Sequence, residues 1–213
     1  MSDIAIFPAR TTTGMPHKKH LYKDKKLRLA MKKEPGIVLE KKQHIHLVLC
    51  ASIISQQLST KAAATIHGRF RGLFSEKNPK PQDILKIPFE TLRSIGLSQA
   101  KATYVRNVCA FFIEEKINDQ KLHQMHRDEV IATLTKIKGV GRWTVEMLLM
   151  FGLGDEDVFS AGDLALQQSM VKLYDLGHLD KKSLMSELMR ISENWKPYRT
   201  HACLYLWHWS DQD

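Results

Sequence analysis

The chain has 213 residues and a formal net charge of +9, and 43% of its residues are hydrophobic. This length suits one large domain or two small lobes, and the hydrophobic content is ordinary for a globular protein. No apolar run reaches the roughly 18 to 20 residues of a membrane span, and the first residues lack a secretory signal. We therefore expect an intracellular protein that does not act at a membrane.

The positive charge is concentrated near the N-terminus. Residues 1–44 contain 11 Lys and Arg against four Asp and Glu, which accounts for +7 of the net charge of +9. A lysine-rich segment can hold polyanions by releasing their counterions, and it can also keep a chain soluble. Charge alone leaves both roles open.

The three cysteines, Cys50, Cys109 and Cys203, are far apart and have no CxxC or CxxH spacing. They do not form a metal-binding or iron–sulfur signature. We expect them to be buried, reduced thiols.

Apolar periodicity and capping residues predict helices along almost the whole chain. Residues 1–20 show no period and are expected to be disordered or draped on the surface. Residues 78–81, which contain two prolines, are predicted to be a linker. The predicted helices cover residues 21–33, 42–58, 60–70, 88–96, 99–115, 126–137, 142–151, 164–174, 181–194 and 197 onward. No segment alternates like a strand, so the expected fold is all-α, a globule of about eight to ten helices.

Gly139 and Gly141 lie between two of these helical patterns and predict a helix-hairpin-helix motif at about residues 129–151. Glycines let the backbone approach a ligand closely, and the N–H groups that open the second helix suit a phosphate. An acidic loop follows and leads to Asp163. The stretch is typical of a clamp for a nucleic-acid backbone with a carboxylate beside it.

Several motifs then occur in a recognisable order along the chain. They are Ile54-Ser55-Gln56-Gln57-Leu58-Ser59, then Leu92-Arg93-x-Ile95-Gly96-Leu97-Ser98-x-x-Lys101-Ala102-x-Tyr104, the IKGVGRWT hairpin, Asp157-Val158-Phe159 with Asp163, and Trp195-x-Pro197-Tyr198-Arg199 with Ala202 and Trp207. This order resembles the helix-hairpin-helix DNA glycosylases, and most closely their 3-methyladenine DNA glycosylase II branch. The resemblance runs from about residue 40 to the C-terminus.

The resemblance implies a basic N-terminal extension over residues 1–39, partly disordered or packed on the core. It implies a glycosylase domain over residues 40–213, with the active-site cleft between two helical lobes. The expected protein is a monomer that acts on double-stranded DNA with damaged bases. It flips alkylated, cationic bases such as 3-methyladenine or 7-methylguanine and hydrolyses their N-glycosidic bond, which leaves an abasic site for base excision repair.

The resemblance assigns the catalytic role to Asp163. A carboxylate below the sugar ring stabilises the positive charge of an oxocarbenium-like transition state and orients the attacking water. No cofactor is expected for this chemistry. Asp163 also precedes a helical pattern, so an N-cap is its alternative role. The neighbouring Asp155, Glu156 and Asp157 are expected to form a solvated acidic turn.

Three aromatic residues are candidates for the pocket that receives the base. Trp143 occupies the position where bifunctional relatives carry a lysine nucleophile, so no Schiff base and no strand cleavage are expected. Trp207 matches a pocket tryptophan whose ring can stack on a cationic purine, and Tyr198 is a weaker candidate. The alternative for Trp143 and Trp207 is a place in the core.

Two further sets of residues are expected to contact DNA. Gln57 matches the wedge that relatives insert where the base leaves the stack, with Leu58 as the other candidate wedge; Gln57 is otherwise a polar residue at a helix end. The backbone of the hairpin is expected to hold a phosphate, through Gly139, Val140, Gly141, Arg142 and Trp143. Its carbonyls suggest a structural cation near Ile137 and Val140.

Two residues depart from the family pattern. Lys138 stands where a proline commonly precedes the first hairpin glycine, and Gly162 replaces the first of two acids that are often paired. Two other functions also stay open. One is a helix-hairpin-helix DNA-binding module without catalysis, and the other is a glycosylase for oxidised guanine or a deaminated base.

Overall fold

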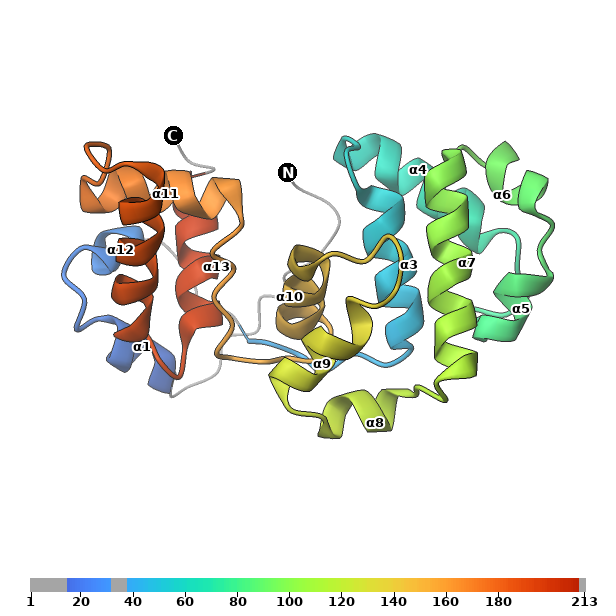
Figure 1. Cartoon of the computed structure of the whole chain (residues 1–213), viewed down its shortest axis with the longest axis horizontal. Helices are drawn as coiled ribbons and strands as arrows, with labels where there is room; N and C mark the ends of the chain where they lie inside the picture. The colour runs from blue at the N-terminus through green and yellow to red at the C-terminus, as the bar shows by residue number, and fades with distance from the viewer. Residues whose placement is uncertain (1–14, 32–37, 211–213) are drawn as a thin grey trace. The chain divides into compact units, whose positions relative to one another are not determined.

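The computed structural model describes residues 15–31 and 38–210, and the chain is all-helical there, with thirteen helices and no strand (Figure 1). These residues form two compact units. The first consists of residues 41–153, and the second combines the described residues up to 40 with residues 154–210. Within the described ranges, none of the helices is both long and apolar enough to span a membrane.

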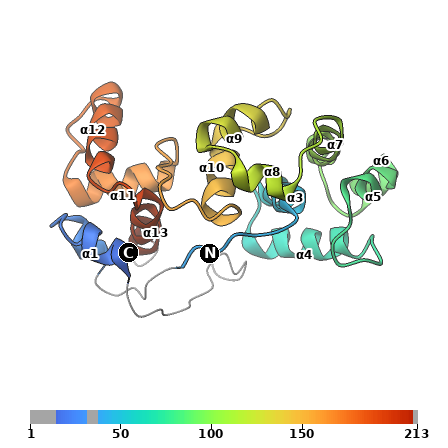
Figure 2. The same ribbon diagram turned by 90° about the horizontal axis from the view of Figure 1, so that it is seen from below.

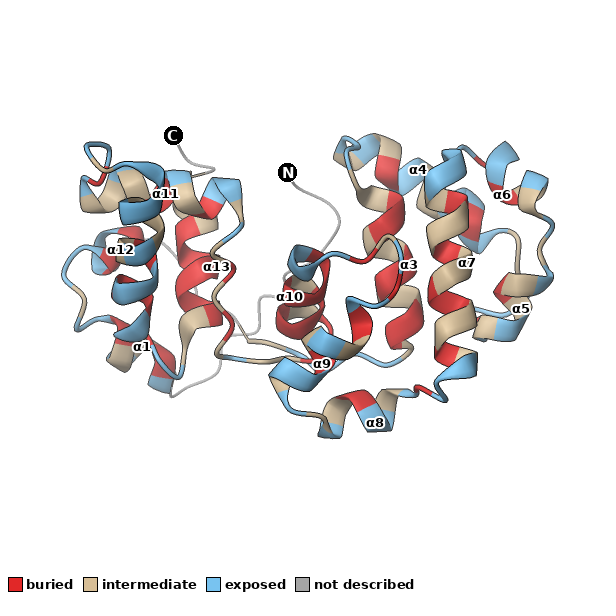
Figure 3. Cartoon of the chain, viewed as in Figure 1, coloured by how far each residue is buried: buried red, intermediate tan, exposed pale blue. Residues whose placement is uncertain are grey.

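The first unit is built around two adjacent helices, α3 and α7, which pack against each other. Its helices are α3 (Ile45–Ser55), α4 (Thr60–Arg71), α5 (Pro81–Lys86), α6 (Phe89–Ser94), α7 (Gln99–Glu114), α8 (Asp119–Gln124), α9 (Arg127–Leu134) and α10 (Arg142–Phe151). Ser59 and Ser98 cap α4 and α7, because each side chain accepts a backbone N–H of the first turn. Figure 3 shows buried residues along both α3 and α7.

All three cysteines are free and buried, as expected. Cys50 of α3 lies against Cys109 of α7, and both side chains are fully inaccessible to solvent. The neighbouring Cys109 thiol and burial raise the pKa of Cys50. These cysteines therefore act as small core residues at the α3–α7 contact.

The second unit is built around its last helix, α13 (Arg199–Ser210), in which seven consecutive residues are buried. The other helices of this unit are α1 (Pro16–Leu21), α2 (Leu27–Ala30), α11 (Leu164–Tyr174) and α12 (Lys181–Glu193). Helices α11 and α2 both pack on α13, and Figure 2 shows α11 beside it. Trp195 and Tyr205 are the largest fully buried side chains of the unit.

The N-terminal segment differs from the expectation. A single helix over residues 21–33 was wrong for the described residues 21–31, because α1 ends at Leu21 and a turn follows before α2, whereas residues 32 and 33 lie outside the described part of the chain. Asp24 explains the break: its Oδ1 accepts the backbone N–H groups of Lys26 and Leu27, each at 3.0 Å. The prediction that residues 1–20 have no regular structure was also wrong where α1 forms. Residues 1–14 lie outside the described part of the chain.

Short helices account for most of the remaining differences. Pro81, expected in a linker, begins α5, and α8 was not predicted, because six residues are too few to show a period. Pro197 does not start the last helix: the Lys196–Pro197 peptide bond is cis, and α13 begins at Arg199. The bounds of α10 and α11 agree with their predictions.

Candidate active site and nucleic-acid interface

The hairpin, which we define as residues 135–141, joins α9 to α10 in the first unit. Gly139 has φ +103, which favours glycine, and a Cβ there would lie 2.1 Å from Cγ of Tyr104. Gly141 is the N-cap of α10 with φ −87, and a Cβ there would meet nothing within 4 Å. The fold therefore requires a glycine at residue 139 but leaves open space beside residue 141.

The start of α10 presents backbone N–H groups. Val140 donates its N–H to the Ile137 carbonyl at 2.9 Å. Within the described residues, the N–H groups of Gly141 and Arg142 donate to no backbone acceptor and are not capped by a side chain. Helix N-termini with such N–H groups bind anions well, so this end of α10 can receive a phosphate.

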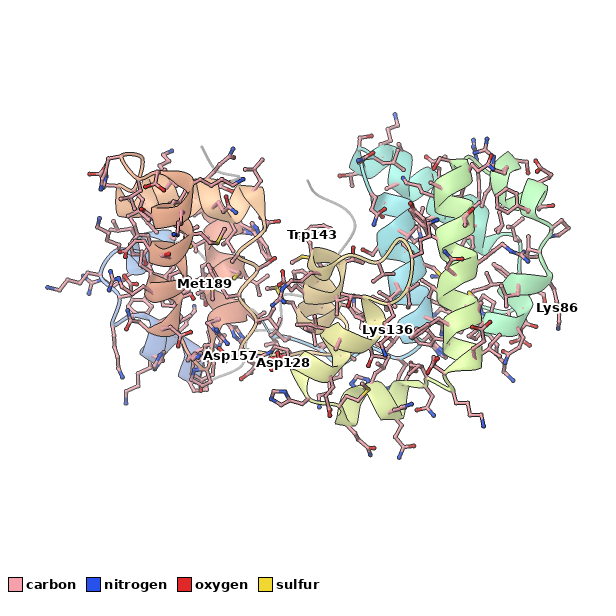
Figure 4. All side chains as sticks on the ribbon, viewed as in Figure 1. Lys86, Asp128, Lys136, Trp143, Asp157 and Met189 are labelled. Atoms are coloured by element: carbon pink, nitrogen blue, oxygen red, sulfur yellow. The ribbon has the colours of Figure 1, made fainter. Side chains whose placement is uncertain are left out.

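The residues that flank these N–H groups are exposed and mostly basic. Lys136, Lys138 and Arg142 are exposed, and Arg142 Nε donates to Oε1 of the buried Glu146 at 2.9 Å. Trp143 is 44% exposed at the start of α10, so it is not a core residue (Figure 4). An exposed tryptophan of this size is unusual and is a candidate ligand contact.

A second exposed corner of the first unit, residues 55–59, connects α3 to α4. Gln57 has φ +55, an uncommon conformation for a residue with a side chain, and both Gln57 and Leu58 are exposed. Lys101 of α7 holds this corner, because its Nζ donates to the carbonyls of Ile54 at 2.9 Å and Gln56 at 2.6 Å.

Asp163 lies at the N-terminus of α11 in the second unit and is partly buried. Its Oδ1 accepts the Leu166 N–H at 2.8 Å, so the expected N-cap is confirmed. The same oxygen accepts the indole Nε1–H of Trp207 at 2.9 Å. Two residues that are 44 positions apart in sequence thus meet in one hydrogen-bonded pair.

The expectation of a solvated acidic turn before Asp163 was wrong for Asp157 (Figure 4). Arg199 binds both oxygens of its carboxylate, Nε to Oδ1 at 2.7 Å and Nη2 to Oδ2 at 2.9 Å. The side chains are only 12% and 20% exposed. Thr200 adds hydrogen bonds to the backbone of Asp155 and Val158. The loop that leads to Asp163 is therefore fixed to the start of α13, the helix that carries Trp207.

Tyr198 lies in a different environment from the one predicted for a pocket residue. Its ring is edge-on to the rings of His17, His20 and His201, at centroid distances between 5.7 and 6.2 Å. Tyr198 therefore packs against the N-terminal segment of the second unit. Its place in a base pocket stays a prediction.

The predicted site residues fall into the two units. Asp163, Trp207 and Tyr198 belong to the second unit, whereas the hairpin, Trp143 and the 55–59 corner belong to the first. The sequence did not indicate the roles of Lys101 and Arg199. Both stand inside the quoted motifs, but their partners are 42 to 47 residues away in the sequence, and no local pattern reports such a contact.

The chain matches the HhH-GPD superfamily of base excision DNA repair proteins over residues 50–197, which is more than half of its length. It belongs to this superfamily. The all-helical fold and the α9–α10 motif agree with that membership. The predicted resemblance to helix-hairpin-helix glycosylases is thereby confirmed.

Two curated relatives are similar over most of this HhH-GPD chain. The putative DNA-3-methyladenine glycosylase YfjP of Bacillus subtilis is 34% identical over 161 residues, which are 73% of this chain and 55% of that protein. DNA-3-methyladenine glycosylase 1 of Schizosaccharomyces pombe is 35% identical over 175 residues, which are 81% of this chain and 75% of that protein. The chain thus spans about half the length of the Bacillus relative.

Solved structures of the superfamily include similar folds. A DNA-3-methyladenine glycosidase from Bacillus halodurans superposes with a TM-score of 0.79 at 37% identity, covering 92% of this chain and 89% of that chain. The Schizosaccharomyces pombe 3-methyladenine DNA glycosylase in complex with abasic DNA gives a TM-score of 0.76 at 32% identity, covering 91% and 95%.

Proposed function

We propose that this chain is a monofunctional DNA glycosylase that removes alkylated, cationic bases such as 3-methyladenine or 7-methylguanine from duplex DNA. The observation that carries the proposal is the Asp163 carboxylate, which Leu166 and Trp207 hold by two hydrogen bonds. The relatives named DNA-3-methyladenine glycosylase support the same activity. The product is an abasic site, the substrate of the next step of base excision repair.

The proposed reaction is hydrolysis at the sugar carbon that bears the base. The bond from this carbon to the base nitrogen breaks, and the base takes the electron pair and leaves as a neutral purine. The sugar becomes an oxocarbenium-like cation, which the Asp163 carboxylate stabilises. A water oxygen then bonds to the sugar carbon and gives its proton to the carboxylate. A cationic base needs no general acid, because its positive charge already makes it a good leaving group.

The proposal excludes strand cleavage by this chain. A glycosylase that also cuts the strand forms a Schiff base between a lysine and the sugar. Trp143 stands where a lysine would be required, and an indole cannot form this adduct. Strand breaks are therefore expected only after alkali treatment of the abasic product.

Aromatic rings select the base in this proposal. A cationic purine is attracted to the face of an indole by about 1–2 kcal/mol when water is excluded. Trp207 donates through its edge to Asp163, so its face is compatible with stacking. The exposed ring of Trp143 is the second candidate, and Tyr198 is the third.

The first unit supplies the DNA contacts. The hairpin backbone at Gly139, Val140, Gly141, Arg142 and Trp143 is proposed to surround a phosphate, although the Val140 N–H is already donated to the Ile137 carbonyl and is not one of the donors. These contacts fix the position of the strand without reading sequence. Gln57 or Leu58 is proposed to fill the space that the flipped base leaves. Both are exposed, as a wedge requires.

A structural cation at the hairpin remains a proposal. Carbonyl oxygens are suitable ligands for a hard cation. The Ile137 carbonyl already accepts the Val140 N–H, and the Lys138 carbonyl accepts Nδ2 of Asn107 at 3.1 Å. A carbonyl oxygen that accepts one hydrogen bond keeps a second lone pair. The Ile137 carbonyl, together with the Val140 carbonyl, is therefore proposed to bind such an ion. It would hold the turn and take no part in the reaction.

The decisive experiment compares Asp163→Asn with Asp180→Asn. Asp180 caps α12 as Asp163 caps α11, so the control reproduces the loss of charge at a helix start. We expect Asp163→Asn to lose release of 7-methylguanine from alkylated duplex DNA by at least about 100-fold, while DNA binding is retained. Asp180→Asn should keep the parental rate. Release at the parental rate by Asp163→Asn would refute the mechanism, and no release by the parent would leave a DNA-binding module.

A further inference from the structure

One side of α7 carries three polar residues that hold both predicted DNA-binding segments of the first unit. Lys101, Tyr104 and Asn107 are spaced by three, so they share one side of the helix. Lys101 holds the 55–59 corner, while Tyr104 and Asn107 hold the hairpin. A single helix therefore contacts both loops, and the helices that adjoin them, α3 and α10, also pack on each other.

Lys101 closes the C-terminal end of α3. The carbonyls at a helix end have no partner within the helix and carry partial negative charge. Lys101 Nζ donates to Ile54 in the last turn and to Gln56, the C-cap residue whose backbone turns extended at ψ 130. Burial among these groups lowers the pKa of Lys101.

The conformation held by Lys101 is an uncommon one. Gln57 follows directly, at φ +55, although no glycine stands there. A side-chain residue stays in this region only where its surroundings fix it. Gln57 and Leu58 are exposed, and the Leu58 N–H donates to the Ser55 carbonyl at 3.2 Å. Two hydrogen bonds from Lys101 of α7 hold the corner.

The hairpin rests on the next two residues of the same side of α7. The Tyr104 ring occupies the space that a Cβ of residue 139 would fill, so the Gly139 backbone lies directly on the ring. Asn107 Nδ2 donates to the Lys138 carbonyl at 3.1 Å. The hairpin is therefore seated against α7 on both sides of the peptide bond between residues 138 and 139.

We propose that α7 fixes the distance between the wedge and the phosphate clamp, and that Lys101 is the positioning residue for the wedge. This inference rests on the proposed function, because it assigns base flipping to the 55–59 corner. Lys101 does not touch the reacting atoms. It holds Gln57 and Leu58 in the conformation proposed for the wedge. Because the corner is already ordered, less free energy is lost in ordering it when the base is unstacked.

The test separates flipping from chemistry with two substrates. One duplex carries 7-methylguanine paired with cytosine, and the other carries it opposite an abasic site, where no partner base has to be lost. The variant Lys101→Met keeps the length of the side chain and removes both hydrogen bonds. We expect its single-turnover release rate to fall at least tenfold on the paired duplex and less than threefold on the unpaired one. Lys101→Arg should recover much of the paired rate.

A matched control is Lys121→Met. Lys121 of α8 also donates its Nζ to a backbone carbonyl, that of Glu115 at 3.4 Å, but lies away from the corner. It should leave both rates unchanged. A 2-aminopurine beside the lesion gives a second measurement, because its fluorescence rises on unstacking, and Lys101→Met should suppress this rise.

The outcomes distinguish a failure of the proposed role of Lys101 from a failure of the proposed glycosylase function. Equal loss on both duplexes, or no loss on the paired one, overturns the role of Lys101 while leaving the glycosylase activity in place. No release by the parental protein from either duplex overturns the proposed function instead. If Lys101→Met does not fold, Lys101→Gln is measured in its place, because its amide can still donate to one carbonyl.

Discussion

At the scale of single residues, Asp163 has the N-cap role that the sequence presents beside the proposed catalytic one. Its Oδ1 caps α11 through Leu166 and binds the indole of Trp207. Capping fixes the carboxylate at a helix start, and the indole N–H fixes its orientation. The edge of Trp207 therefore orients the proposed catalytic carboxylate, whereas its face is proposed to meet the base.

The two roles of Trp207 can be separated by Trp207→Phe, which keeps an aromatic face and removes the N–H. A hydrogen bond to a charged group contributes about 1.5–3 kcal/mol, so the release rate should fall about tenfold or more. Trp209→Phe is the control, since Trp209 lies on the same helix and its ring faces the Lys172 ammonium at 5.2 Å. Single-turnover release of 7-methylguanine measures both variants. Equal rates would show that the hydrogen bond to Asp163 is dispensable.

The two hairpin glycines should respond differently to alanine. At Gly139 a methyl group would meet the Tyr104 ring, and φ is positive, so Gly139→Ala should lower the free energy of unfolding by about 2 kcal/mol or more. Gly141→Ala meets no atom and should cost under about 1 kcal/mol, the difference between two N-cap residues.

Gly141→Ala, which should cost little stability, should in contrast weaken DNA binding. The new methyl group of Gly141→Ala would stand where a phosphate approaches, which should weaken binding to an abasic duplex about tenfold, the equivalent of one lost hydrogen bond. Urea denaturation and fluorescence anisotropy measure the two effects. Unaltered DNA affinity of Gly141→Ala would argue against a phosphate at this end of α10.

At the scale of elements, a poorly exposed ion pair helps to hold the loop before α11. Arg199 binds Asp157 through two nitrogens, and both side chains are poorly exposed. A lysine has no planar guanidinium group, so it should leave the Asp157 carboxylate with fewer hydrogen bonds. We expect Arg199→Lys to lower the free energy of unfolding by about 1–3 kcal/mol.

A second pair in the same unit provides the comparison. Arg190 also binds Glu187 through two nitrogens, at 2.7 and 2.6 Å, but its side chain is 68% exposed. Arg190→Lys should therefore cost less stability than Arg199→Lys. Thermal unfolding of both variants tests the difference, and equal costs would show that burial of the Asp157 pair contributes nothing.

The elements also show what could be predicted from the sequence. Ser98 and Asp163 begin helices whose own patterns follow them directly, so their capping roles were visible locally. Asp24 was missed, because its breaking of the N-terminal helix depends partly on Tyr174 and Trp195, which are 150 and 171 residues away. Periodicity describes the buried side of one helix and not its partner. For the same reason, Lys101 could be quoted in a motif without its function being evident.

At the scale of the whole molecule, the second unit is assembled from both ends of the chain. Asp24 Oδ2 accepts the Tyr174 hydroxyl at 2.6 Å and the Trp195 indole at 3.0 Å. Burial opposes ionisation of Asp24, but these bonds and two backbone N–H groups outweigh it and lower its pKa. The N-terminal segment is thus an integral part of the unit that carries Asp163, whatever its lysines add in DNA binding.

This assembly should weaken on mild acidification because of His17. The His17 ring is buried and stacks on His201 at a centroid distance of 4.0 Å, and burial, with a smaller effect of Lys18, lowers its pKa from 6.5 to about 4. The unfolded chain binds a proton there near pH 6.5, whereas the folded chain does so only near pH 4. The contribution of His17 to stability is therefore complete above pH 6.5 and is lost as the pH falls toward 4.

His17→Phe removes this titration and keeps a ring against His201. Between pH 7 and pH 5, the midpoint of thermal unfolding should fall a few degrees less in His17→Phe than in the parent, after allowance for solvent screening. Circular dichroism at several pH values measures both proteins, and the difference between their slopes cancels the other titrating groups. Parallel slopes would mean that the folded protein accommodates the imidazolium, and that the N-terminal segment is not held by a neutral His17.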